Sequence, residues 1–246
     1  MKKIVAMLLT AAMLFTLAAC GSTNIAGRSE NTNVPQSSSV PESSDVPETA
    51  PLRSPETPDA SDIVPDADAS GEAKILIAYF SRAGENYNVG VIEKGNTAIL
   101  AEMIAEQTGG DLFHIETTTP YPETYQECTD VAQQELRDNA RPALSATVDN
   151  FADYEVIFLG YPIWWSDMPM AVYTFLESDD FGEKTIVPFA THEGSGLAST
   201  ESSIKNACSG AAVLDGLALC GAVAQNEQEE AKDAVTNWLR GAGFVE

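Results

Sequence analysis

Strand-like and helix-like patterns alternate about five times between residue 74 and the end of this 246-residue chain. Residues 74–80 and 156–159 are continuous apolar runs, which are typical of strands that a parallel sheet buries on both faces. The intervening segments have helical spacing; residues 228–240, for example, place alanine, valine, tryptophan and leucine on one face. This alternation predicts one α/β domain, residues 74–246, with a parallel sheet between two layers of helices.

The same pattern predicts the order of the sheet. Crossovers between parallel strands are right-handed, and a doubly wound sheet of five strands commonly has the order 2-1-3-4-5. Pro188 falls inside the fourth strand and has no N–H to donate, so we expect that strand to be short or bulged. Asp167 is expected to cap the helix after the third strand. The predicted strands are residues 74–80, 111–116, 156–160, 185–190 and 211–219, and the predicted helices are residues 96–107, 123–138, 197–207 and 228–240, with one more from about residue 168.

The first nineteen residues have the composition of a targeting signal. Lys2 and Lys3 precede an apolar stretch, residues 4–15, and small residues lead to Cys20. The sequence Leu-Ala-Ala-Cys resembles a bacterial lipoprotein signal, which implies removal of residues 1–19 and lipidation of Cys20. An ordinary secretory peptide and an uncleaved anchor are the alternatives, although the apolar stretch is shorter than the roughly 20 residues that span a bilayer.

Residues 20–73 have the composition of a linker. They hold seven of the chain's thirteen prolines, ten acidic residues against Arg28 and Arg53, and no aromatic residue. Such a segment buries too little apolar surface to offset its conformational entropy. We therefore expect a disordered tether between the lipidated Cys20 and the folded domain.

The charge of the chain excludes one class of partner. The formal net charge is −24, and removal of residues 1–19 takes away two lysines and no acid, which gives −26. A chain this acidic is not expected to bind nucleic acid, nor an anionic lipid surface through its charge. Membrane attachment is therefore expected to depend on the lipid at Cys20.

Three cysteines remain after Cys20, namely Cys128, Cys208 and Cys220. They form no Cys-x-x-Cys pair and have no histidine nearby, so no metal site is expected. A Cys208–Cys220 disulfide is one possibility, but buried free thiols are favoured.

Two loops are predicted to line one crevice. In the 2-1-3-4-5 order, the loops after the first and third strands meet where ligands of open α/β sheets bind. Ser81 starts the first loop and Asn96 the helix after it, so hydroxyls and free N–H groups favour an anion such as phosphate. Turn and cap chemistry alone is the alternative. This loop has no Gly-x-x-x-x-Gly-Lys-Ser/Thr or Gly-x-Gly-x-x-Gly motif, which weakens the case for nucleoside triphosphates and dinucleotides.

Adjacent tryptophans, Trp164 and Trp165, follow the third strand directly. Loops are normally polar because water satisfies their backbone groups, so two indoles at the carboxyl end of a buried strand indicate a flat, apolar ligand. The alternative is that one or both tryptophans plug the end of the sheet as core residues.

The loops after the first, third and fourth strands together resemble the flavodoxin-like FMN-binding family over residues 74–246. The segments that carry the resemblance are residues 79–82, 95–97, 160–165 and 188–196. The resemblance implies FMN as the cofactor, with its phosphate at the first loop and its flavin ring between the other two. It assigns the phosphate to Ser81, Arg82, Ala83, Asn96 and Thr97, the ring to Pro162, Ile163, Trp164 and Trp165, and the polar edge of the ring to Thr191, Gly194, Ser195 and Gly196.

The sequence departs from this family in its first loop. Ordinary flavodoxins close that turn in a few residues, whereas residues 85–94 intervene here between Ser81 and Asn96. Tyr87 and Asn88 could form a flap near the ligand or a simple solvent loop, and the solvent loop is favoured.

The resemblance implies an FMN-binding redox protein that transfers electrons or hydride through the flavin. With the predicted lipid anchor, it would act at the extracytoplasmic face of a bacterial membrane. One alternative is an FMN-dependent oxidoreductase that uses NAD(P)H to reduce a quinone or another small molecule. A second is a cofactor-free binding module that uses the aromatic loop. No catalytic acid, electron donor or electron acceptor is identified by the sequence.

Overall fold

The computed structural model describes residues 73–246. The predicted signal peptide, residues 1–19, the lipidation site Cys20 and residues 20–72 of the predicted linker lie outside the described residues. Within residues 73–246, no helix is both long and apolar enough to cross a membrane.

The core of the domain is a parallel sheet with the strand order β4-β1-β5-β6-β7, in which β8 also pairs with β6. Since β7 and β8 are two pieces of the fifth predicted strand, the order 2-1-3-4-5 is confirmed. The α/β, doubly wound class is confirmed as well. The strands are β1 (Ile75–Tyr79), β4 (Asp111–His114), β5 (Val156–Pro162), β6 (Thr185–His192), β7 (Ala212–Val213) and β8 (Leu217–Cys220).

Pro188 lies in β6, but the strand that is interrupted beside it is the neighbouring fifth strand, which is divided into β7 and β8. The expectation of a short or bulged fourth strand was wrong, because β6 runs without a break through Pro188. On the side of the fifth strand, the Ile186 carbonyl accepts the Leu214 N–H at 3.0 Å. Pro188 follows two residues later on that side and has no N–H to donate. The fifth strand is interrupted opposite this position, where a Cβ on Gly216 would lie 2.8 Å from the Pro188 carbonyl oxygen.

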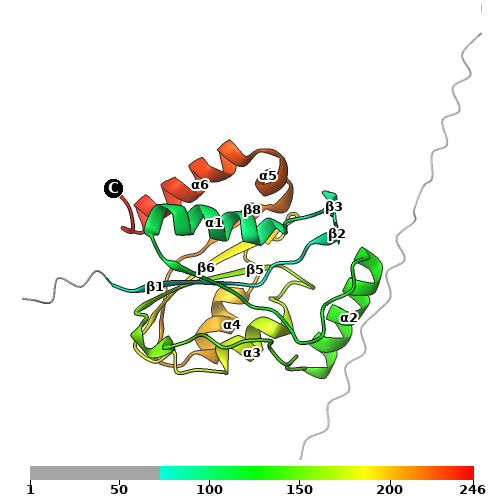
Figure 1. The fold of residues 1–246 in the computed structure, drawn as a ribbon, viewed down its shortest axis with the longest axis horizontal. Helices are drawn as coiled ribbons and strands as arrows, with labels where there is room; N and C mark the ends of the chain where they lie inside the picture. The colour runs from blue at the N-terminus through cyan, green and yellow to red at the C-terminus, as the bar shows by residue number, and fades with distance from the viewer. Residues whose placement is uncertain (1–72) are drawn as a thin grey trace, which may run out of the picture. The chain divides into compact units, whose positions relative to one another are not determined.

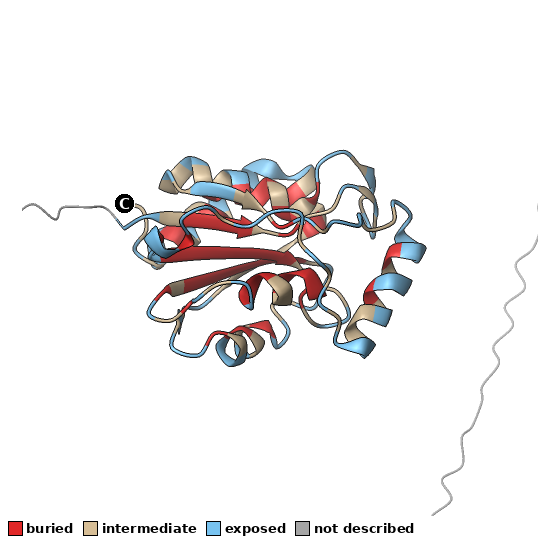
Figure 2. Cartoon of the chain, turned by 60° about the horizontal axis from the view of Figure 1, so that its bottom comes forward, coloured by how far each residue is buried: buried red, intermediate tan, exposed pale blue. Residues whose placement is uncertain are grey.

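Helices cover both faces of the sheet, and buried residues concentrate on the strands and on the inner faces of the helices (Figures 1 and 2). One core cluster joins alternate strand residues such as Ile77 and Phe158 to helices on one face, and a second joins Leu76 and Ile157 to helices on the other. The first face carries α1 (Asn96–Thr108), α5 (Gly221–Asn226) and α6 (Gln228–Gly241), the second carries α3 (Met170–Leu176) and α4 (Thr200–Ala207), and α2 (Tyr125–Asp138) contacts α3.

The predicted elements all exist, with shifted ends and three additions. The third strand does not end at Gly160 as predicted, since β5 continues to Pro162. The glycine has a packing role instead, because a side chain at Gly160 would collide with the Phe189 ring. The cap of α3 is Pro169 rather than Asp167, whose carboxylate instead accepts the Tyr173 hydroxyl. The sequence did not predict α5, the short helix η1 (Phe151–Asp153), or the antiparallel hairpin formed by β2 (Gly84–Asn86) and β3 (Gly90–Ile92).

The three cysteines of the domain are free thiols, as favoured from the sequence. Cys128 and Cys208 are buried, whereas Cys220 is partly exposed.

Candidate functional site

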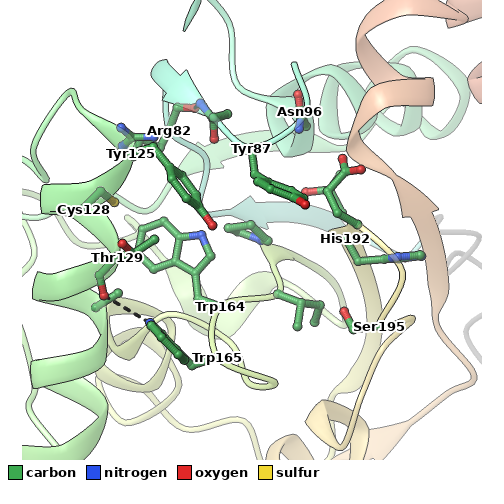
Figure 3. A pocket seen from close by; sticks show the side chains of 16 residues that line it. Arg82, Tyr87, Asn96, Tyr125, Cys128, Thr129, Trp164, Trp165, His192 and Ser195 are labelled. Atoms are coloured by element: carbon green, nitrogen blue, oxygen red, sulfur yellow. Dashed lines mark hydrogen bonds between the residues drawn. The ribbon is translucent and has the colours of Figure 1, made fainter. Parts of the chain in front are cut away.

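A cavity of about 320 Å³ lies at the carboxyl ends of β5 and β6, between the β2–β3 hairpin, α2 and α1 (Figure 3). Its volume is at the lower end of the roughly 300–1,000 Å³ that small-molecule sites occupy. This is the crevice that the strand order predicts. The lining residues are Arg82, Asn86, Tyr87, Asn96, Tyr125, Cys128, Thr129, Ala132, Pro162, Ile163, Trp164, Trp165, Thr191, His192, Glu193 and Ser195.

The first loop packs tightly against the start of α1. Ser81 Oγ accepts the Ala98 N–H at 3.0 Å, so this hydroxyl caps the helix from outside it. A Cβ on Gly95 would collide with Ser81 Oγ and would lie 2.6 Å from the Arg82 carbonyl oxygen. Ser81 and Ala83 are absent from the cavity lining. The structure therefore gives Ser81 the cap role that the sequence left open beside a phosphate role.

The polar end of the cavity is formed by the first turn of α1 and the end of β6. The hydroxyls of Thr97 and Thr191 lie 2.8 Å apart, and both residues are buried, but only Thr191 belongs to the cavity lining. Asn96 lines the cavity, and its side-chain oxygen is buried without a hydrogen-bond partner among the described residues. An unpaired buried polar atom costs about 1–3 kcal/mol. A ligand with a polar group at this position would remove that cost.

The Arg82 guanidinium, predicted to contact a phosphate, is hydrogen-bonded to backbone carbonyls in this structure. It donates to the carbonyl oxygens of Pro122 at 3.0 Å, Glu85 at 2.7 Å and Glu123 at 2.6 Å. The side chain thus joins the hairpin to the loop that precedes α2. Because backbone carbonyls accept from all three guanidinium nitrogens, Arg82 is placed as a structural clamp at the edge of the cavity.

The loop after β5 is a tight two-residue turn that presents Trp165. The Trp164 N–H donates to the Asp167 carbonyl at 2.8 Å, and the Asp167 N–H donates back at 3.0 Å. Between them Trp165 and Ser166 have φ values of 53° and 65°, the left-handed pair that a type I′ turn requires. Residues other than glycine adopt this conformation at a cost, and such strain concentrates at functional sites.

The two tryptophans have different environments. Trp164 packs edge-on against Phe80 and Tyr121, with ring centroids 5.3 and 5.2 Å away, and belongs to the margin of the core. Trp165 is 50% exposed, and its indole N–H donates to the Thr129 carbonyl of α2 at 3.1 Å. In Figure 3 this bond holds the Trp165 ring at the side of the cavity next to α2. Both tryptophans line the cavity, and Trp164 packs against the core as well.

Tyr161 belongs to the segment 160–165 that carries the family resemblance, but it is a core residue. It lies in β5, is fully buried, and donates its hydroxyl to Thr200 Oγ1 at 2.9 Å. Burial raises the pKa of Tyr161 well above its usual value, so the hydroxyl stays protonated.

The end of β6 contributes His192 to the cavity, and the loop after it contributes Glu193 and Ser195, whereas Gly194 and Gly196 lie outside the lining. The Gly194 N–H donates to His192 Nδ1 at 2.8 Å, so in the neutral imidazole the proton is on Nε2. The φ of Gly194 is 115°, which a residue with a side chain rarely adopts.

The hairpin and α2 form the wall that the sequence did not predict. Tyr87 of the hairpin is 57% exposed and Tyr125 of α2 is 39% exposed, and their ring centroids lie 5.8 Å apart beside the cavity (Figure 3). The preference for Tyr87 in a simple solvent loop was therefore wrong. The amphipathic pattern of α2 could have indicated an inward face, but not that Cys128 and Thr129 reach a cavity.

The cavity offers no reactive thiol. Burial raises the pKa of the Cys128 thiol, and Glu135 adds to this while Arg82 opposes it. The thiol is therefore protonated at neutral pH and acts as an apolar wall.

Comparisons with known proteins agree with this architecture. The model of the flavodoxin family matches residues 74–240. A candidate flavoprotein from Bacteroides eggerthii is 30% identical with a TM-score of 0.56, and the match covers 69% of this chain and 98% of that protein. A second, from Bacteroides uniformis, is 29% identical with a TM-score of 0.55, covering 68% and 98%. No curated protein matches the sequence significantly.

Proposed function

The chain belongs to the flavodoxin family, and we propose that it is a redox protein that binds FMN in the cavity between α1, α2 and the ends of β5 and β6. The observation that carries this proposal is the two-ended cavity. A helix N-terminus with an unpaired amide oxygen lies at one end, and a half-exposed indole lies at the other.

The residues at the polar end fit the phosphate and the hydroxylated chain of FMN. The N–H groups of Asn96 and Thr97 lie in the first turn of α1, where the helix provides no internal partner for them. Together with the helix dipole they favour a phosphate. The unpaired Asn96 oxygen is placed to accept a hydrogen bond from a hydroxyl beside that phosphate. Thr191 lines the same end and positions Thr97 through their shared hydrogen bond.

The residues at the apolar end fit a flat ring. Pro162, Ile163, Trp164 and Trp165 line the cavity after β5. The hydrogen bond to Thr129 fixes the Trp165 ring before any ligand arrives. Tyr87 and Tyr125 cover the opposite side and reduce access of water. Such preorganisation lowers the entropy cost of binding.

FMN, when bound, supplies electron or hydride transfer, and the protein supplies its orientation and electrostatic environment. Arg82 and Glu193 are the charged residues of the cavity lining, and backbone carbonyls already accept from the Arg82 guanidinium. The guanidinium is thus engaged elsewhere, and the chain as a whole has a net charge of −24. Both properties disfavour added negative charge on the flavin ring. We expect this environment to lower the reduction potential of the cofactor.

An FMN titration tests this function. Purified protein is supplemented with FMN and followed by flavin absorption and by quenching of flavin fluorescence, with Leu214→Ala, an exposed site outside the cavity, as the control variant. We expect saturable binding in both proteins. If neither purified nor refolded protein binds added FMN, the proposal is wrong.

The cellular location is a separate proposal, supported by the sequence of residues 1–20. We propose that the protein is lipidated at Cys20 and acts at the extracytoplasmic face of a bacterial membrane. The test is Cys20→Ser in the full chain, with Cys220→Ser as the control. The first variant should lose both metabolic labelling by fatty acid and membrane association. If it stays labelled and membrane-bound, Cys20 is not the anchor.

The exposed aromatic side chains at the cavity favour one second candidate, an NAD(P)H-dependent reductase of quinones or other small molecules. Stopped-flow mixing of the FMN-loaded protein with NADH distinguishes it from an electron carrier. Direct bleaching of the flavin bands by NADH supports the reductase, whereas reduction only by a one-electron donor supports the carrier. A protein that binds no flavin and keeps the aromatic surface would instead be a binding module.

A further inference from the structure

The β2–β3 hairpin occupies the place of a short turn between β1 and α1. Its two strands pair with each other, and among the described residues they add to no larger sheet. Asn86 and Tyr87 line the cavity, while Val91 on the second strand is 82% exposed. The hairpin therefore has one side toward the cavity and one toward solvent.

The two ends of the hairpin are held by several hydrogen bonds. At β2, the Arg82 guanidinium donates to Pro122, Glu85 and Glu123 carbonyls, and the Glu85 N–H donates to the Glu123 carbonyl at 2.8 Å. The Glu85 carboxylate also accepts the Tyr125 N–H at 2.9 Å, at the start of α2. After β3, the Lys94 carbonyl accepts from Gln225 at 2.6 Å.

The tip has a single hydrogen bond across the cavity. Asn88, with φ of 63°, donates its side-chain N–H to Glu193 Oε2 at 2.8 Å, and this bond is exposed to solvent. Glu193 Oε1 accepts the Ala222 N–H at 3.1 Å, so the acceptor is fixed to the start of α5. The contact joins residues 105 positions apart in the sequence.

We propose that the β2–β3 hairpin is a lid over the cavity, with Arg82 as the positioning residue of its hinge and the Asn88–Glu193 hydrogen bond as its latch. The inference rests on the proposed function, since the lid would control entry and release of FMN. Opening breaks one exposed hydrogen bond and separates Tyr87 from Tyr125, while the bonds at both ends remain. This difference between ends and tip makes the tip the part that moves.

The latch is tested by two substitutions of Asn88. Asn88→Gly removes the amide and keeps a residue that tolerates a positive φ. We expect FMN to dissociate about 2–13 times faster, because one lost hydrogen bond is worth about 0.5–1.5 kcal/mol and about 1.4 kcal/mol is tenfold in rate. Asn88→Asp places a second carboxylate against Glu193, so the increase should be larger and should shrink at high salt. Val91→Ser, on the solvent side of the same hairpin, is the control and should match the unchanged protein.

Amide hydrogen exchange of residues 84–92 in FMN-free protein gives a second readout that does not depend on the cofactor. Asn88→Gly should exchange faster there than Val91→Ser. If FMN binds but both Asn88 variants release it at the control rate, the lid is wrong and the proposed function stands. If FMN does not bind at all, the proposed function fails, and equal exchange in the two variants would overturn the latch as well.

Discussion

The loops after β5 and β1 bound the same cavity by opposite means. After β5, a two-residue turn with two left-handed residues fixes Trp165 against α2. After β1, a hairpin reaches across the cavity and is held at its tip by one exposed hydrogen bond. The first loop stores backbone strain to hold one ring in place, whereas the second has firm ends and a weakly held tip. The difference assigns a fixed wall to one loop and a movable cover to the other.

Removal of the Arg82 side chain should have the largest effect. Arg82→Ala removes a donor from three carbonyls, of which the Glu123 carbonyl keeps another, the Glu85 N–H. We expect a loss of about 2–3 kcal/mol of unfolding free energy, because charged hydrogen bonds contribute about 1.5–3 kcal/mol each and these are partly exposed. Urea unfolding measures it. Arg137→Ala is the control, since that guanidinium donates to the side chains of Gln133 and Gln134 of its own helix in hydrogen bonds that are exposed to solvent. Equal stability of the two variants, with FMN affinity lost only in Arg82→Ala, would make Arg82 a phosphate ligand instead.

A side chain at Gly95 should have the second-largest effect, on the packing of the loop after β1. Gly95→Ala forces its Cβ against Ser81 Oγ and the Arg82 backbone, and we expect a loss of about 1–3 kcal/mol together with weaker FMN binding. Thermal unfolding and FMN titration measure the two effects. Gly241→Ala, where a Cβ meets nothing within 4 Å, is the control. Unchanged stability in Gly95→Ala would show that the loop does not pack as tightly as described.

Because the turn after β5 is strained, a glycine substitution in it should increase the stability of the protein. Ser166→Gly keeps the φ of 65° with a residue that adopts it freely, and we expect a rise of up to about 1 kcal/mol in stability, with FMN affinity unchanged. Ser145→Gly, at a position without a positive φ, should not stabilise the protein. A loss of stability in Ser166→Gly would contradict the account of strain.

The smallest effect on stability is expected at Glu135, which accepts a hydrogen bond from the Tyr121 side chain that packs against Trp164. Tyr121 packs against Trp164 and donates to Glu135 at 2.7 Å, and burial raises the pKa of that carboxyl. When the pKa of a carboxyl is higher in the folded than in the unfolded protein, its ionisation destabilises the folded state. The protein is therefore less stable at neutral pH than at low pH by this amount. Glu135→Gln should therefore raise the melting temperature slightly at pH 7. The gain should shrink as pH falls through the raised pKa and vanish below the unfolded value of about 4.3. A gain that is constant with pH would exclude this cause.

Patterns in the sequence predicted the sheet and one side of the cavity. Apolar runs identify β1 and β5, because burial on both faces leaves few polar residues in such strands. Helical spacing of apolar residues identifies α1. Trp164 and Trp165 were found because two indoles after a buried strand are unusual. Both line the cavity, but only Trp164 also packs against the core, and this difference depends on two φ angles and on the Thr129 carbonyl, which spacing does not encode.

The other side of the cavity depended on contacts between distant segments. Arg82 follows a buried strand, as a phosphate ligand would, and only the approach of Pro122 and Glu123 turns it into a clamp. The hairpin is short and polar, so its alternation is too weak to predict strands. Likewise Pro188 indicated that a strand would be disrupted, but not whether this would be the fourth strand, which contains it, or the fifth strand beside it.

Single alanine substitutions of the two tryptophans test the fixed wall most directly. FMN affinity and melting temperature are measured for both variants. We predict that Trp165→Ala weakens FMN binding about tenfold or more, because it removes an aromatic contact and apolar area worth about 1.5 kcal/mol or more, while the melting temperature changes little. Trp164→Ala should mainly lower the melting temperature. Unchanged FMN affinity in Trp165→Ala, or loss of the fold on that substitution alone, would contradict the account.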